Sequence, residues 1–241
     1  MIRARTLLPL VACMAAVLAP AVVVSAQAVP PVPPTAPPAA PTTGPGGLAF
    51  SGPSLRQGAG GQEVALFQIR LVERGFWIGD RLGSFGDSTT HAVVAFQKYL
   101  GLPRSGVIDG WTRIALAAGT DRMGPRTPRA DHSIDVDLGR QILIIQTGGR
   151  VDWIFDISSG KRSTPTPRGQ FTLQRQIRGV QHAKLGVLYS PKYFTGGYAI
   201  HGSPSVPNYP ASHGCVRLTI AAINFLWSSG QANLGTPISI H

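Results

Sequence analysis

Cysteine is nearly absent from this sequence. The 241-residue chain has two, Cys13 and Cys215, and the first lies in a segment that export would remove. A mature protein with one thiol cannot form an internal disulfide, which excludes a disulfide-stapled fold. A lone thiol in an oxidising compartment is exposed to oxidation, so its presence favours a chemical role. A buried, inert cysteine that packs as a small hydrophobe is the alternative.

Acidic residues are also few. The chain has 11 Asp and Glu against 22 Lys and Arg, a net charge of +11, and charged residues make up only 14% while hydrophobic residues make up 43%. That apolar content supports a buried core and excludes wholesale disorder. The basic excess favours polyanionic surroundings, such as an acidic cell-wall polymer, an anionic membrane face or nucleic acid. No stripe of Arg and Lys with interleaved aromatics is present, which argues against nucleic acid.

The N-terminus has the pattern of an export signal. Arg3 and Arg5 precede a mainly apolar run over 7–24, and small residues follow at 25–28. We predict a signal peptide over 1–28 and a secreted protein in the cell wall or periplasm, with no stable membrane span after cleavage. An uncleaved membrane anchor and a lipoprotein acylated at Cys13 are the alternatives.

Two different periodicities divide the remainder. Residues 29–47 are rich in proline and predict a semi-rigid linker. Residues 48–120 carry apolar side chains at helical spacing and predict three short helices: one from about Val64 that ends at Gly75, one capped by Ser88 or Thr89 that ends at Gly101, and one over 112–118. A second linker is predicted over 121–131.

In residues 132–241 the apolar side chains recur at every second position instead. Alternating or continuous apolar runs predict strands at 133–138, 141–147, 151–157, 171–177, 198–201 and 237–241, and residues 219–227 predict one buried helix. The expected fold class is therefore α+β and multidomain, with a small three-helix bundle followed by a mainly-β domain.

The residues that carry chemistry lie near the C-terminus. They form two runs, Ile200-His201-Gly202-Ser203 and Ser212-His213-Gly214-Cys215-Val216-Arg217. A thiol is a nucleophile when ionised, and a neighbouring imidazole can accept its proton. Glycines permit tight turns and close approach of a substrate. Arg217, two residues after the thiol, is a candidate to hold a carboxylate.

A metallohydrolase is a competing interpretation, since His182, His201, His213 and Cys215 are all candidate ligands. Their spacing matches no recognised zinc motif, and no carboxylate accompanies them. We therefore predict no metal and no cofactor.

The helical segment resembles the peptidoglycan-binding domain of wall hydrolases. The resemblance is carried by spaced residues along nearly the whole of 48–120: Leu55-Arg56, Gly58, Gly61, Val64, Gln68, Leu71, Gly75, Gly83-Ser84-Phe85-Gly86, Thr89, Ala92-Val93, Phe96-Gln97, Gly101-Leu102, Gly106 and Thr112. It implies a module that holds the wall polymer. The family's usual aspartate in the middle loop is here Leu82.

The segment from about 133 to 241 resembles the L,D-transpeptidase catalytic domain. Besides the thiol motif, the match includes Ser163-Thr164-Pro165-Thr166-Pro167-Arg168-Gly169-Gln170-Phe171 and Gly235-Thr236-Pro237. The resemblance implies a β-sandwich with a shallow tunnel beneath a lid hairpin. The domain boundaries we expect are 48–120 for the binding domain and 132–241 for the catalytic domain.

The same resemblance implies roles for individual residues. Cys215 would be the nucleophile and His201 the proton acceptor and donor, oriented by the carbonyl of Gly202. His213, Gly214 and the Cys215 amide would stabilise the oxyanion. Ser212, Arg217 and Tyr198 are tentative substrate-binding residues, and Tyr189, Tyr193 and Phe194 either contact the stem peptide with Tyr198 or simply pack.

The expected function is that of a cysteine-dependent peptidoglycan L,D-transpeptidase, an acyltransferase that cross-links stem peptides in cell-wall biogenesis and cell-shape maintenance. Its expected partner is peptidoglycan, both glycan strands and stem peptides. The alternatives are an L,D-carboxypeptidase on the same stems and a non-catalytic wall-binding protein. Because the thiol lies outside 48–120, we expect deletion of that segment to weaken wall attachment and to spare turnover of short soluble peptides.

Overall fold

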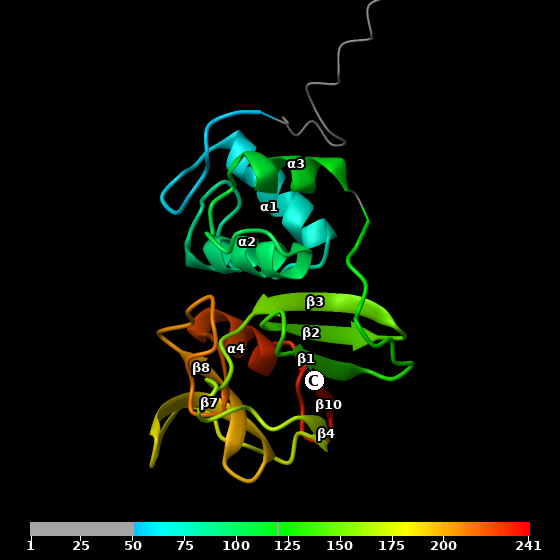
Figure 1. Cartoon of the computed structure of the whole chain (residues 1–241), viewed down its shortest axis with the longest axis vertical. Coiled ribbons are helices and arrows are strands. Elements are labelled where there is room, and N and C mark those ends of the chain that lie inside the picture. The colour runs from blue at the N-terminus through cyan, green and yellow to red at the C-terminus, as the bar shows by residue number, and fades with distance from the viewer. Residues whose placement is uncertain (1–50, 120) are drawn as a thin grey trace, which may run out of the picture. The chain divides into compact units, whose positions relative to one another are not determined.

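The computed structural model describes residues 51–119 and 121–241, which belong to one compact unit. The predicted signal peptide, Cys13 and the proline-rich linker lie outside the described residues. Within them, three helices precede ten strands, and a fourth helix lies between the last two strands (Figure 1). The predicted fold class, a three-helix bundle followed by a mainly-β part, is confirmed. No helix in the described ranges combines the length and apolar character needed to cross a membrane.

The helical part consists of α1 (Gln62–Glu73), α2 (Asp87–Leu100) and α3 (Gly110–Ala118). Their apolar faces meet in a core that includes Val64, Phe67 and Phe96. Between α1 and α2, the Gln68 side chain accepts from the Gly83 amide at 2.7 Å and donates to Ser84 and Thr89, each at 2.9 Å. One buried amide therefore ties the middle loop to both helices.

The predicted N-cap of α2 was wrong by two or three residues. The helix begins at Asp87, with Gly86 rather than Ser88 or Thr89 at the N-cap. The Ser88 hydroxyl instead accepts hydrogen bonds from the amides of Gly79 and Asp80, at 2.9 and 2.8 Å. It fixes the preceding loop, a task that competes with capping. Gly75 does follow the end of α1 with a positive φ of 100°, which a glycine adopts without strain.

The first sheet has the strand order β3-β2-β1-β10-β4. These strands are β1 (Ser133–Asp137), β2 (Ile142–Thr147), β3 (Arg150–Asp156), β4 (Gly169–Thr172) and β10 (Pro237–Ile240). The second sheet has the order β5-β7-β8-β9, and β6 pairs with β7. Its strands are β5 (Arg175–Gln176), β6 (Val180–Ala183), β7 (Gly186–Thr195), β8 (Tyr198–Ser203) and β9 (Val216–Thr219).

The two sheets and helix α4 (Ile220–Ser228) enclose one hydrophobic core. Ile134 and Val136 of β1 reach it from the first sheet, and Ile200 of β8 reaches it from the second. Thr219 caps α4 by accepting from the Ala222 amide at 3.1 Å. The predicted helix at 219–227 and the closing strand at 237–241 are confirmed to within one residue at each end.

The outer face of the first sheet packs on the helical part (Figure 1). Ile142 and Ile144 of β2 and Ile154 of β3 belong to the same buried cluster as the helices, and each is 0% exposed. The Trp77 amide donates to the Ile154 carbonyl at 3.1 Å, and the Ile154 amide donates to the Gly75 carbonyl at 2.8 Å. Helical and β parts therefore share a core, which the sequence did not predict.

Candidate active site

A cavity of about 450 Å³ brings together most of the predicted site residues. One side is formed by residues 183–188, the turn of the β6–β7 hairpin and the start of β7. The other side contains six predicted residues: Tyr198, His201, Ser212, His213, Cys215 and Arg217. Gly202 and Gly214 are not in its lining, although each is next to a residue that is.

The pairing of β8 and β9 explains why these side chains converge. The strands are parallel, and His201 lies opposite Arg217 in the register. Cys215 comes directly before β9, so the thiol enters the cavity beside the strand that carries the imidazole. Gly202 faces the core, where an added Cβ would lie 2.6 Å from Ile223 and 2.9 Å from Tyr189. Glycine at 202 therefore allows β8 to pack closely on α4 and β7.

The imidazole of His201 is buried and neutral at physiological pH. His201 is only 3% exposed, and its Nδ1 is 2.9 Å from the carbonyl oxygen of Gly202. Burial, with a smaller contribution from the charge of Arg217, lowers the pKa of His201 to about 4, although the Gly202 contact acts in the opposite direction. With the proton on Nδ1 donating to that carbonyl, Nε2 keeps a free lone pair and can act as a base.

The thiol of Cys215 is partly buried, and it is the free cysteine of the described residues. Burial raises the pKa of Cys215, while the backbone of Ala199 and the charge of Arg217 oppose that rise. Sγ lies 3.8 Å from the carbonyl oxygen of Gly197. Among the hydrogen bonds of the described residues, none joins Sγ to His201. Because the pKa of Cys215 is raised and that of His201 is lowered, the thiol and the imidazole share the cavity in their uncharged forms.

The turn before Cys215 is held by Ser212. Its hydroxyl donates to the Cys215 carbonyl at 2.5 Å and accepts from the Gly214 amide at 3.1 Å. Gly214 has a φ of 111°, and a Cβ there would collide with the ring of Tyr198. Glycine is needed at 214 for both reasons. Because the Gly214 amide already has a partner inside the turn, it is a poorer candidate for the oxyanion than the sequence suggested.

The aromatic residues divide into one cavity residue and three that pack. Tyr198 is 37% exposed and lines the cavity. Phe194 is 0% exposed within the core between the sheets, and Tyr189 packs against that core. Tyr193 is buried beside Leu188 and Ala199, under the guanidinium of Arg175. Three of the four tyrosine and phenylalanine candidates thus support the fold around the cavity.

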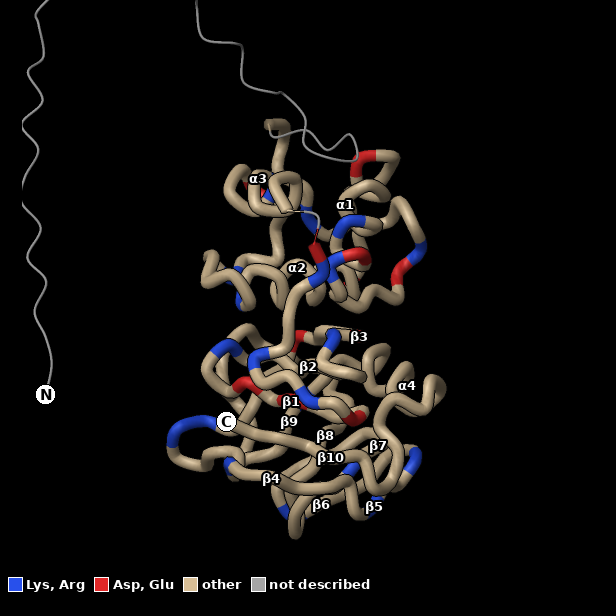
Figure 2. Tube along the Cα trace, turned by 90° about the vertical axis from the view of Figure 1, so that its right-hand side faces the viewer, with Lys and Arg blue, Asp and Glu red and all other residues tan. Residues whose placement is uncertain are grey.

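Sequence reasoning missed the cations that surround this cavity. Lys184 lines it from the hairpin, and Lys161 Nζ lies 3.5 Å from Nε2 of the exposed His213. The signal was available: residues 157–241 contain no Asp or Glu, although they contain Lys161, Arg162, Arg168, Arg175, Arg178, Lys184, Lys192 and Arg217. In Figure 2 the red segments lie in the helical part and around β1 and β3, whereas only blue segments occur around the labels of β4, β5 and β6.

Of the four residues considered as metal ligands, His201, His213 and Cys215 line the cavity, and His182 does not. His182 is on the exposed strand β6, next to but outside the cavity lining. Across 51–119 and 121–241, no group of three His, Cys, Asp or Glu side chains is placed to hold a metal ion.

Comparison with known proteins adds two family matches. Residues 131–240 match the L,D-transpeptidase catalytic domain, and residues 60–116 match the putative peptidoglycan binding domain. A solved L,D-transpeptidase from Xylanimonas cellulosilytica is 39% identical, with a TM-score of 0.72 over 85% of this chain and 100% of that one.

Two curated relatives are similar over shorter stretches. A probable N-acetylmuramoyl-L-alanine amidase of Bacillus licheniformis is 41% identical over 70 residues, and a spore cortex-lytic enzyme of Bacillus cereus is 38% identical over 72. These matches cover 28% and 30% of this chain, but only 20% and 28% of the relatives' own lengths.

The fold and the two matches define the class: a catalytic domain of transpeptidase type preceded by a domain of peptidoglycan-binding type. Since the similarity to the Xylanimonas protein extends over the whole of that chain at 39% identity, the protein belongs to the L,D-transpeptidase family. Both resemblances predicted from the sequence are confirmed.

Proposed function

We propose that this protein is a peptidoglycan L,D-transpeptidase that forms cross-links between stem peptides through a thioester on Cys215. The observation that carries the proposal is the placement of the thiol in one cavity with the neutral, carbonyl-oriented imidazole of His201. We further propose that the protein is exported to the cell wall or periplasm, where it takes part in wall biogenesis and maintenance of cell shape.

The first half-reaction is acylation. Sγ of Cys215 attacks the carbonyl carbon of the third stem residue, and the thiol proton passes to Nε2 of His201. The tetrahedral intermediate collapses, the terminal D-alanine leaves, and its nitrogen takes the proton back from the imidazolium. Because burial disfavours both the thiolate and the imidazolium, the ion pair forms together with the attack rather than before it.

The second half-reaction returns the thiol. An amine of a neighbouring stem attacks the thioester carbon, gives a proton to His201, and forms the new peptide bond as Sγ departs with that proton. If water replaces the amine, the product is a shortened stem and the activity is that of an L,D-carboxypeptidase. The same residues serve both reactions, so the acceptor alone distinguishes them.

The carbonyl of Gly202 takes the place of the carboxylate in a serine-protease triad. At 2.9 Å from Nδ1 it fixes the tautomer and the ring orientation without adding a negative charge. For the oxyanion, we assign the backbone of His213 and Cys215 ahead of Gly214, whose amide donates to Ser212. One such donor contributes on the order of 3 kcal/mol to transition-state stabilisation.

The charges around the cavity suit an anionic substrate. Arg217 and Lys184 line it, and no acidic residue occurs after Asp156 in the chain. A surface of one sign raises the local concentration of an oppositely charged substrate. Stem peptides carry carboxylates, so we propose that Arg217 and Lys184 contribute to donor binding with Ser212 and Tyr198, and that residues 48–120 hold the wall polymer.

The test is intact-mass analysis of the full-length mature protein with a tetrapeptide stem. We expect a mass increase equal to the acyl tripeptide, mapped to Cys215, and its loss to a cross-linked product when an acceptor stem is added. Loss to the free tripeptide without cross-linking would indicate the carboxypeptidase instead. Cys215→Ala should give no adduct. If the unmodified protein also gave none, the non-catalytic wall-binding alternative would replace the proposal.

A further inference from the structure

The helical part is hydrogen-bonded to the loop that leads into Cys215. Arg104, which follows α2, donates from Nη1 to the Asn208 carbonyl at 3.0 Å. Asn208 donates in return from Nδ2 to the Arg104 carbonyl at 2.7 Å. Asn208 belongs to residues 204–212, which connect the strand of His201 with the turn of Cys215. The two bonds therefore join the helical part to the active-site loop itself.

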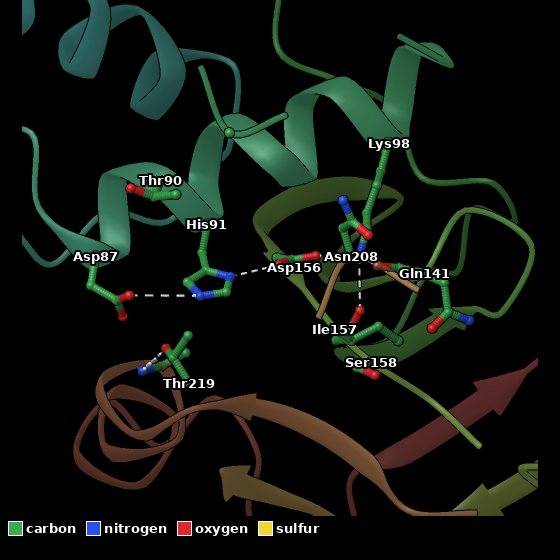
Figure 3. Close-up of polar contacts among 12 residues, drawn as sticks. Asp87, Thr90, His91, Lys98, Gln141, Asp156, Ile157, Ser158, Asn208 and Thr219 are labelled. Carbon is green, nitrogen blue, oxygen red and sulfur yellow. Dashed lines mark hydrogen bonds and ion pairs between the residues drawn. The ribbon is translucent and has the colours of Figure 1, made fainter. Parts of the chain in front are cut away.

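A second connection joins α2 to the end of β3. Lys98 extends from α2, with a side chain 0% exposed, to an ion pair with Asp156. Its ammonium also donates to the carbonyls of Ile157, at 2.8 Å, and Gln141, at 3.2 Å. On the other side of Asp156, Nδ1 of His91 lies 2.6 Å from its carboxylate (Figure 3). Lys98 thus fixes the chain where β3 ends.

The segment that Lys98 fixes continues into the active site. The Ser158 amide donates to the Arg217 carbonyl at 3.1 Å, and the Arg217 amide donates to the Ser158 carbonyl at 3.0 Å. The Ser159 carbonyl accepts from the amides of Ala211 and Ser212, at 3.0 and 2.9 Å. Ser212 is the residue whose hydroxyl holds the turn of Cys215.

The Gln141 side chain joins the same path from the other direction. Its oxygen accepts from the Ser159 amide at 2.9 Å, and its nitrogen donates to the Ser159 hydroxyl at 2.7 Å. Gln141 adopts a φ of 64°, which is uncommon for a residue with a side chain. The Lys98 contact to its carbonyl and these two bonds hold it there.

We propose that the helical part positions the catalytic loop of this transpeptidase, with Lys98 and the Arg104–Asn208 pair as positioning residues that act through Ile157 and the 204–212 loop. This inference rests on the proposed function, and it assigns the helical part a task beyond wall attachment. The loop contains Pro204, Pro207 and Pro210 and no regular element, so contacts with its neighbours hold it. Besides those above, the Ser158 hydroxyl donates to the Tyr209 carbonyl at 2.7 Å. Its position decides where Sγ meets the scissile carbonyl.

The magnitude follows from how steeply rate depends on placement. A displacement of about 1 Å can cost about 100-fold in rate. Loss of the Arg104–Asn208 bonds removes one of two connections, so we expect a smaller shift and a rate loss of about tenfold. Loss of Lys98 removes three hydrogen bonds of the other connection, leaving His91 on Asp156, and should cost more.

The experiment uses the full-length mature protein and a double variant that carries both Arg104→Ala and Asn208→Ala. Both residues lie on the exposed side of the loop. Tyr99→Phe is the matched control, since Tyr99 lies near the end of α2 and its hydroxyl donates to the Gly124 carbonyl at 2.7 Å, away from the loop. Measured quantities are the rate of thioester formation with a short soluble stem, KM, the melting temperature, and the pH profile of Cys215 alkylation by iodoacetamide.

We expect the double variant to acylate about tenfold more slowly, with KM and melting temperature nearly unchanged and the alkylation profile shifted. The Tyr99→Phe variant should match the unaltered protein. Wild-type acylation and alkylation by the double variant would overturn the inference, even if Lys98→Met proved unable to fold. Absence of any thioester in the unaltered protein would instead overturn the proposed function, and the alkylation profiles would still decide the positioning question.

Discussion

Lys98 of α2 and Asp156 at the end of β3 form an ion pair in which the side chains are 0% and 1% exposed. Burial lowers the pKa of Lys98, and the charge of Asp156 and its hydrogen bond to Lys98 oppose that shift. The ammonium also donates to two carbonyls, so its hydrogen-bonding capacity is filled. Since water does not reach this pair, each charge is compensated mainly by the other.

We therefore predict that Lys98→Met destabilises the protein by about 3–5 kcal/mol, because it leaves the carboxylate of Asp156 buried with only His91 as a charged partner. The double variant with Asp156→Leu should recover part of that loss, since no charge remains unpaired. Denaturant unfolding of the three proteins measures both quantities. A double variant less stable than Lys98→Met would show that the pair is not the dominant interaction at this position.

Deletion of residues 48–120 should give a poorly soluble or unfolded protein rather than a smaller active enzyme. The deletion would expose Ile142, Ile144 and Ile154, which are fully buried against the helices. This expectation replaces the one drawn from the sequence, that turnover of short peptides survives the deletion. Circular dichroism and gel filtration of residues 121–241 test it. A monomeric product with a cooperative melt and normal turnover would contradict it.

The sequence predicted most elements because most of them obey a simple period. The strands at β1, β2 and β3 alternate or run apolar, and α1 to α3 carry apolar stripes. Strand β7 was missed, because Pro191 and the positive φ of Ser190 interrupt its pattern. Strand β9, only four residues long, was concealed within the thiol motif.

The site was predicted for a different reason from the fold. Cys215 and His201 were recognised from their motifs, whereas the convergence of β8 and β9 that brings them together is a long-range pairing with no local signal. The Lys98–Asp156 pair did leave a trace in the sequence. Lys98 interrupts the apolar face of its helix four residues after Val94, and Asp156 shares a strand face with Ile154. A cation and a carboxylate on two apolar faces indicate that those faces meet.

Substrate binding should weaken as salt concentration rises. Lys184 and Arg217 line the cavity without a neighbouring carboxylate in its lining, and interactions between exposed charges are screened over about 8 Å at physiological ionic strength. We expect Lys184→Gln to raise KM roughly two- to fivefold, the effect of an exposed pair of up to about 1 kcal/mol. A stem peptide with amidated carboxylates serves as the control. A KM that is equally insensitive to salt for both peptides would contradict the electrostatic account.

As the pH falls, activity should be lost at a lower pH than it would be if the base were a histidine with its usual pKa. Because burial lowers the pKa of His201 to about 4, the imidazole of the free enzyme stays an available base well below pH 6. We expect the acid limb of kcat/KM for acylation to have its midpoint near pH 4. A midpoint near 6.5 would show that the base is a solvated histidine or another group.

The same shift has a consequence for stability, with a definite sign. The pKa of His201 is lower in the folded protein than its usual value of 6.5, so between about pH 6.5 and 4 the unfolded chain binds more protons than the folded one. The free energy of unfolding therefore falls as the pH falls through this window. His201→Gln should flatten that slope in denaturant unfolding measured from pH 7 to 4. An unchanged slope in the variant would mean that other groups, such as the carboxylates, account for the acid sensitivity.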